Sequence, residues 1–305
     1  MPKASKIRIT LAYISIIILW ATTPLAIKWS GEGPGFIFGA GSRMTIGTIC
    51  MLLLLLIQRR RLPSHRRAKL TYIAVATQIY AAMMAVYWGA QFIPSGWVSV
   101  IFGLSPFLTA LFAAIWLKER SLTMGKLLSY FFGLSGLAIM FSSALDLHIS
   151  AVYGIVGVLT AVSLQTASAV WVKRIDAKLP AISQVTGGLI YALPCYLLTW
   201  TVFDNAQWPQ QLSVLNLASI IYLGMIATTI GFALYYYVLI HLPATNVGMI
   251  PLISPVFALY LGNTVNHEPF SLKIAMGTAL ILSALIMHQF LDRFISRLSR
   301  KLSRI

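Results

Sequence analysis

The feature that most constrains this chain is a succession of long, nearly uncharged apolar runs that fills almost its whole length. Ten runs can be outlined, at about 9–29, 36–57, 70–91, 94–117, 124–143, 151–172, 182–203, 215–240, 243–265 and 272–291. A helix of about 20 apolar residues crosses the hydrocarbon core of a bilayer, and it satisfies its own backbone polar groups there. The runs therefore predict an all-α membrane protein with ten transmembrane helices.

Composition argues against the soluble classes of protein. Of the 305 residues, 58% are hydrophobic and only 10% are charged, whereas soluble domains carry about 25% charged residues. The net charge of +16 could suit nucleic acid, but the basic residues lie in short clusters between apolar runs, so no nucleic-acid partner is expected. Cys50 and Cys195 both fall inside apolar runs, and neither a disulfide framework nor a metal site is indicated. No cofactor is expected.

The basic clusters predict the orientation of the chain in the membrane. If the N-terminus lies inside, 20 of the 23 Lys and Arg residues fall on the cytoplasmic side, and only Lys28, Arg43 and Lys273 fall in the outer half. Cytoplasmic loops of membrane proteins carry an excess of Lys and Arg. Both termini are therefore expected in the cytoplasm, with the chain in the inner membrane of a bacterium.

The C-terminal tail carries a separate signal. Residues Phe290–Ile305 interleave Phe294, Leu298 and Leu302 with Arg and Lys. Such a segment is typical of an amphipathic helix that lies on anionic lipid headgroups. We expect anionic membrane lipids to be the partner of this tail and of the basic loops, with a specific partner site as the alternative for the tail.

The fourth and ninth runs match each other without gaps at an offset of 149 residues. The identical pairs are Pro94 with Pro243, Val98 with Val247, Ile101 with Ile250, Ser105–Pro106 with Ser254–Pro255, Glu119 with Glu268 and, just upstream, Tyr87 with Tyr236. The match divides the chain into two five-helix halves, at about 1–146 and 147–305. Because five is odd, the second half enters the membrane upside down. Inverted repeats are typical of alternating-access transporters that bind their substrate near the midplane between the halves.

Several motifs in this order resemble the drug/metabolite transporter superfamily, EamA type, over nearly the whole chain. They are Leu19-Trp20 followed by Lys28, then Arg43, then Pro94, Ser105-Pro106 and Leu117–Arg120, and the second copy Pro243, Ser254-Pro255 and His267-Glu268. The resemblance implies a ten-helix carrier of small metabolites, often an exporter of amino acids or related compounds, in which the fifth and tenth spans are peripheral. This chain has Trp20-Ala21 where the family often has Trp-Gly, and His267 where Gly often precedes the acid.

Two basic residues predict the charge of the substrate. Arg43 lies about seven residues into the second run, and Lys28 ends the first run on the same side. All seven acidic residues fall at run ends or in loops, so neither cation has a deep acidic partner and a substrate carboxylate or phosphate is favoured. The alternatives are snorkelling to the membrane surface or pairing with Glu32. The same distribution of acids predicts that transport does not depend on an embedded carboxylate.

Further candidates are uncharged residues placed near midplane or at paired positions. The complete set of candidates for binding substrate is Trp20, Thr23, Lys28, Arg43, Tyr80, Gln165 and Tyr191. Tyr87 and Tyr236 are candidates for symmetric gates, with interfacial anchoring as the alternative. Pro106 and Pro255 are candidates for hinges, because a mid-span proline frees a backbone carbonyl one turn earlier.

Two other classes of function were weighed against a carrier. Residues 133–136 have the Gly-x-Ser-Gly form of a membrane serine protease, but the only His inside a run is His288, on the order of 15 Å away in depth by helix rise. An enzyme is therefore not expected, and close helix packing explains the motif better. A passive channel or a lipid translocase on the same scaffold stays open. The favoured function is a secondary transporter that exports a small amino acid or related carboxylate.

Overall fold

A computed structural model describes residues 6–118, 124–147, 149–231, 234, 238 and 250–302. Every regular element in these ranges is helical, as the apolar runs predict. The elements are α1 (Lys6–Gly31), α2 (Phe36–Ile57), α3 (Arg66–Ala76), η1 (Thr77–Ala82), α4 (Met83–Gly89), α5 (Ser95–Phe102), α6 (Ser105–Leu117), α7 (Met124–Leu147), α8 (Ser150–Ile175), α9 (Ala181–Phe203), α10 (Val214–Ile221), η2 (Tyr222–Ile230), α13 (Ile250–Asn266) and α14 (Leu272–Leu302). The elements η1 and η2 are π-helices.

The long apolar helices agree with a membrane-spanning chain. Six helical segments of the described ranges are long and apolar enough to cross a bilayer, at Lys6–Gly31, Phe36–Ile57, Arg66–Gly89, Ser95–Leu117, Ser150–Ile175 and Ala181–Phe203. Shorter apolar helices at Leu128–Met140, Val214–Ile230 and Leu272–Met287 coincide with the fifth, eighth and tenth runs. Of the ninth run, the described part begins at Ile250.

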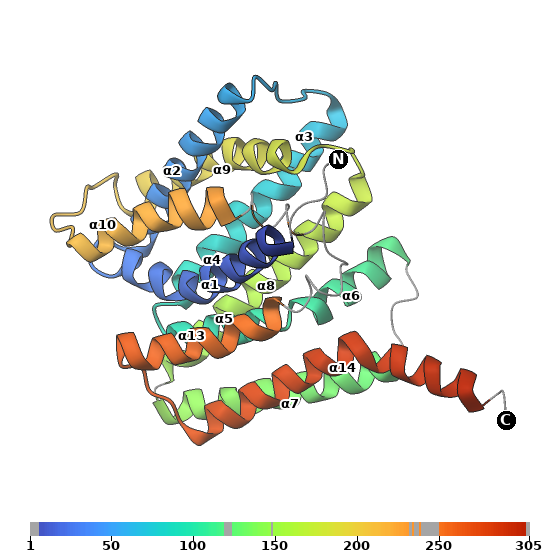
Figure 1. Cartoon of the computed structure of the whole chain (residues 1–305). Coiled ribbons are helices and arrows are strands. Elements are labelled where there is room, and N and C mark those ends of the chain that lie inside the picture. Colours follow the sequence, from blue (N-terminus) through green and yellow to red (C-terminus); the bar gives the residue numbers. More distant parts are fainter. Residues whose placement is uncertain are drawn as a thin grey trace.

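Helices α7 and α14 form a pair at one edge of the bundle (Figure 1). The two helices approach closely because glycines lie at their contact. A Cβ on Gly136 would lie 2.6 Å from the carbonyl oxygen of Gly277, and a Cβ on Gly277 would lie 2.7 Å from Cγ of Met140. The Gly-x-Ser-Gly sequence at 133–136 therefore serves helix packing here. Beyond α7, α14 continues as a helix through the basic tail to Leu302 (Figure 1).

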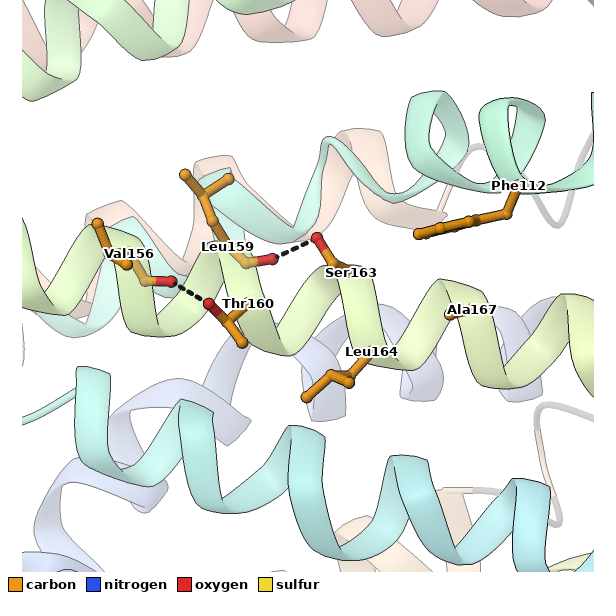
Figure 2. A pocket seen from close by; sticks show the side chains of 7 residues that line it. All are labelled: Phe112, Val156, Leu159, Thr160, Ser163, Leu164 and Ala167. Carbon is orange, nitrogen blue, oxygen red and sulfur yellow. Dashed lines mark hydrogen bonds between the residues drawn. The ribbon is translucent and has the colours of Figure 1, made fainter. Parts of the chain in front are cut away.

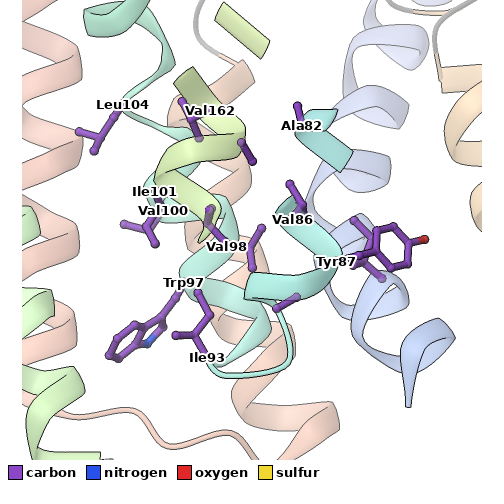
Figure 3. Packing of buried hydrophobic residues seen from close by; sticks show 14 of the residues in the cluster. Ala82, Val86, Tyr87, Ile93, Trp97, Val98, Val100, Ile101, Leu104 and Val162 are labelled. Atoms are coloured by element: carbon purple, nitrogen blue, oxygen red, sulfur yellow. The ribbon is translucent and has the colours of Figure 1, made fainter. Parts of the chain in front are cut away.

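The main core extends over most of the bundle, and Figure 3 shows its part where α4, α5 and α8 meet. Trp97, Ile101 and Val162 are fully buried there. The crossing of α4 and α8 is again a glycine contact, since a Cβ on Gly89 would lie 2.8 Å from the carbonyl oxygen of Gly154. Small residues at such crossings allow helix backbones to approach closely in a membrane.

The run at 94–117 is two helices in the structure, with a break at Gly103 and Leu104 between α5 and α6. Pro106 lies in the first turn of α6, where the missing N–H removes no helical hydrogen bond. The hydroxyl of Ser105 donates to the carbonyl of Phe102, which satisfies an acceptor that the break leaves free. Pro255, in contrast, lies inside α13.

Helix ends recur at the offset of 149 residues that the sequence shows. Helix α6 ends at Leu117 and α13 ends at Asn266. The residue that follows each is left-handed, with φ of 54° at Lys118 and 51° at His267. Glycine adopts this backbone conformation without strain, which explains why glycine would fit at the position of His267.

Candidate functional site

A cavity of about 360 Å³ lies in the middle of the bundle. Helices from both halves of the chain line it, and its polar lining comprises Trp20, Thr23, Arg43, Gln78, Ser99, Ser105, Gln165, Thr228 and Ser254. The remaining lining residues are mostly aliphatic, among them Ile27, Val86 and Leu189. The cavity is therefore an apolar chamber with a few polar groups that converge on it, which is the usual form of a small-molecule site.

Arg43 is the single charged side chain among the described residues that line this cavity. It is only 7% exposed. Its Nε donates a hydrogen bond of 3.3 Å to Oγ1 of Thr228, whereas its buried Nη1 has no acceptor among the described residues. A buried cationic donor left without a partner is costly, so the chamber favours an anionic group beside Arg43.

The two π-helices both contribute to this cavity. Gln78 and Ile79 come from η1, and Ala227 and Thr228 come from η2. In η2 the hydroxyl of Thr228 donates to the carbonyl of Leu223, five residues earlier, at 2.8 Å. Short π-helical segments are frequent at functional sites. Hydropathy does not distinguish a π-helix from an α-helix, so sequence reasoning missed Gln78 and Thr228.

Four residues expected to bind substrate line the cavity, namely Trp20, Thr23, Arg43 and Gln165, and so does the hinge candidate Pro255. Tyr80 does not, because its hydroxyl bonds to Thr199 and its ring packs on Tyr196. Tyr191 is 39% exposed and packs on Tyr72.

The other candidates lie at the end of α1 or outside the site. Lys28 forms an ion pair of 3.5 Å with Glu268 and does not line the cavity. Tyr87 is buried in α4, and its hydroxyl accepts a hydrogen bond of 3.3 Å from Ser30. Pro106 lies next to the lining residue Ser105. Tyr236 lies outside the described residues.

A second hollow, of about 370 Å³, lies between α6 and α8 (Figure 2). Its two hydroxyls are turned to their own helix, because Thr160 donates to the carbonyl of Val156 and Ser163 to that of Leu159, each at 2.8 Å. The rest of its lining is apolar, including Phe112 and Leu164. Neither hydroxyl among its described lining residues is free to donate to a polar substrate, so we place the candidate substrate site at the central cavity.

Comparison with known proteins agrees with a transport function. The chain is 26% identical over 290 residues to the uncharacterized transporter YoaV of Bacillus subtilis, covering 93% of this chain and 97% of that protein. It is 24% identical over 289 residues to a probable terminal-alkyne amino-acid exporter of Streptantibioticus cattleyicolor, covering 91% and 92%. A crystal structure with a TM-score of 0.64 and 20% identity covers 95% of this chain and 99% of its own, and it shows the same fold.

The family profile is matched twice along the chain. The EamA-like transporter family matches residues 7–142 and, a second time, residues 152–288. Together the two matches cover most of the sequence, and the relatives are named as transporters rather than enzymes. The chain therefore belongs to the EamA-like transporter family and is a membrane transporter, not an enzyme.

Proposed function

We propose that this transporter exports a small carboxylate-bearing metabolite, an amino acid or a related compound, across the bacterial inner membrane. The observation that carries the proposal is the buried guanidinium of Arg43, which faces the central cavity with Nη1 unpartnered among the described residues. A guanidinium pairs with a carboxylate through short, charge-assisted hydrogen bonds. Gln78, Gln165 and Ser99 offer neutral partners for the rest of the molecule.

The proposed mechanism is alternating access between two inverted halves, 1–146 and 147–305. The double family match and the helix ends that recur at an offset of 149 residues support this arrangement. The cavity supports it too, because Arg43 of α2 and Thr228 of η2 meet there from different halves. The proposed orientation keeps both termini in the cytoplasm, with the basic tail on anionic lipid.

Export is the proposed direction because one relative is named as an amino-acid exporter. The structure adds a reason for selectivity. A chamber with a single cation among its described lining residues favours a substrate with one carboxylate over a substrate with several charges.

The proline hinges remain part of the proposal, with Pro255 at the cavity and Pro106 at the break between α5 and α6.

The decisive experiment is counterflow in proteoliposomes that contain the purified protein. A panel of amino acids and small organic acids is tested, and each transported compound is compared with its amide, which lacks the carboxylate. The parent protein should prefer the acid, and Arg43→Gln should lower acid transport by about tenfold or more, because charged hydrogen bonds contribute about 1.5–3 kcal/mol.

The matched control is Arg60→Gln, since Arg60 is exposed in the loop between α2 and α3. It should leave the preference for the acid unchanged. If Arg43→Gln still discriminates acid from amide in protein of normal abundance, the substrate role of Arg43 is wrong. Flux that does not saturate would favour a passive channel, and lipid scrambling without counterflow would favour a translocase.

A further inference from the structure

A buried carboxylate joins distant parts of the chain at one end of the bundle. Glu268 lies in the loop between α13 and α14 and is only 7% exposed. Its oxygens accept hydrogen bonds from the backbone N–H of Ser95 at 2.9 Å, the hydroxyl of Ser95 at 3.0 Å and the backbone N–H of Gly96 at 3.4 Å. These donors form the first turn of α5, where the helix dipole also favours a negative charge.

Two side chains complete the surroundings of this carboxylate. Nδ2 of Asn266 donates to it at 2.9 Å, and Nζ of Lys28 pairs with it at 3.5 Å. Asn266 in turn accepts a hydrogen bond of 3.0 Å from the indole of Trp29. We call Lys28, Trp29, Ser95, Asn266 and Glu268 the Glu268 cluster. It connects α1 and α5 of the first half with the end of α13 in the second half.

The backbone around the Glu268 cluster is shaped to admit the carboxylate. A Cβ on Gly262 would overlap Oε2 of Glu268, and a Cβ on Gly96 would lie 2.8 Å from Cα of Leu259. The backbone N–H of Glu268 donates to the carbonyl of Gly262 at 3.0 Å. A buried charge is tolerated only when it is paired and hydrogen-bonded in this way, and removing a partner is strongly destabilising.

The Glu268 cluster borders the central cavity. Ile27, which precedes Lys28, and Val98, one turn after Ser95, both line the cavity. We propose that the Glu268 cluster is a gate that holds this end of the cavity closed, and that its contacts break when the transporter opens to this face. This gate rests on the proposed alternating access, but it does not depend on the identity of the substrate.

The gate is tested by the accessibility of a cysteine in the cavity. The background protein carries Cys50→Ala and Cys195→Ala, which removes both native cysteines, and Val98→Cys is added. A membrane-impermeant maleimide is applied either to the face of the cluster or to the opposite face, using right-side-out and inside-out vesicles. Glu268→Gln should raise labelling from the cluster face by about tenfold and lower it from the opposite face.

Glu32→Gln is the matched control, because Glu32 is an exposed acid just beyond the end of α1. It should leave the rate of maleimide labelling unchanged from both faces. Lys28→Met should act in the same direction as Glu268→Gln. If Glu268→Gln leaves the labelling of Val98→Cys unchanged, the gate proposal is wrong. It is also wrong if labelling increases from both faces, because that result indicates a general loosening of helix packing. If Glu268→Gln does not fold, Ser95→Ala removes one donor and is judged by the same outcomes. Because labelling needs no substrate, a failed substrate proposal would leave this result interpretable.

Discussion

Arg43 combines two properties that rarely occur together in a membrane helix, a full charge and almost complete burial. An isolated Arg near the centre of a spanning helix costs about 2.5–3.5 kcal/mol on insertion scales. The structure offsets part of this cost through the hydrogen bond from Nε to Thr228, while Nη1 stays unpartnered among the described residues. Thr228 thereby fixes one edge of the guanidinium and leaves another edge for a ligand.

Thr228→Val should raise the KM of carboxylate counterflow by about tenfold and change the maximal rate less, because the guanidinium loses the acceptor that orients it. Thr228→Ser keeps the hydroxyl and should retain the parent KM. Thr229→Val is the matched control, since Thr229 makes the same kind of bond to the carbonyl of Gly224 but does not line the cavity. Equal KM values for the two valine variants would contradict the positioning role of Thr228.

Two of the four sequence candidates that line the cavity have a chemistry that is unusual for their surroundings. Arg43 and Gln165 stand out because each interrupts an apolar run, and both line the cavity. The role of Lys28 could not be derived from the sequence, because its partner Glu268 lies 240 residues away. The tyrosines were ambiguous for a different reason, since an aromatic ring fits helix packing as well as a binding site.

At the scale of the element, hydrophobic runs predicted where most helices lie. The second run, at 36–57, coincides with α2, and the seventh, at 182–203, differs from α9 by one residue. The interior of the helices was less predictable. The carbonyl of Ile79 in the π-helix η1 accepts a hydrogen bond of 2.6 Å from the hydroxyl of Tyr196 in α9, a long-range contact that no local pattern encodes.

The pair formed by α7 and α14 allows stability to be separated from transport, because neither helix contributes a described residue to the cavity lining. Gly136→Ala should lower the stability by about 1–3 kcal/mol, since the added Cβ would meet the backbone of α14 at 2.6 Å. The midpoint of thermal unfolding in detergent, followed by size-exclusion chromatography, measures the change.

Gly41→Ala is the control for this substitution. A Cβ at Gly41 finds its nearest neighbour at 4.0 Å, so the unfolding midpoint should stay close to that of the parent. The folded fraction of Gly136→Ala should keep the parent KM in counterflow. A raised KM with an unchanged midpoint would show that the α7–α14 pair acts on the substrate site.

For the whole molecule, the central question is whether the two halves have opposite orientations. The loop 204–213 leads into α10, where Nδ2 of Asn216 donates to the carbonyls of Trp29 and Glu32 at 2.7 Å. This loop therefore lies near the start of α2. The equivalent loop in the first half, 58–65, follows the other end of α2 (Figure 1), on the order of 30 Å away by helix rise.

Inverted halves thus predict that the two equivalent loops face opposite sides of the membrane. In the background without native cysteines, an impermeant maleimide added to intact cells should label Gln211→Cys and leave Ser64→Cys unlabelled. Inside-out vesicles should give the reverse pattern, because the Arg-rich loop 58–65 is expected in the cytoplasm. Ser64 and Gln211 are both exposed, so the reagent reaches each position without passing through the bundle. Labelling of both cysteines from the same side would show that the halves are parallel, and the cavity between them could not then work by symmetric alternating access.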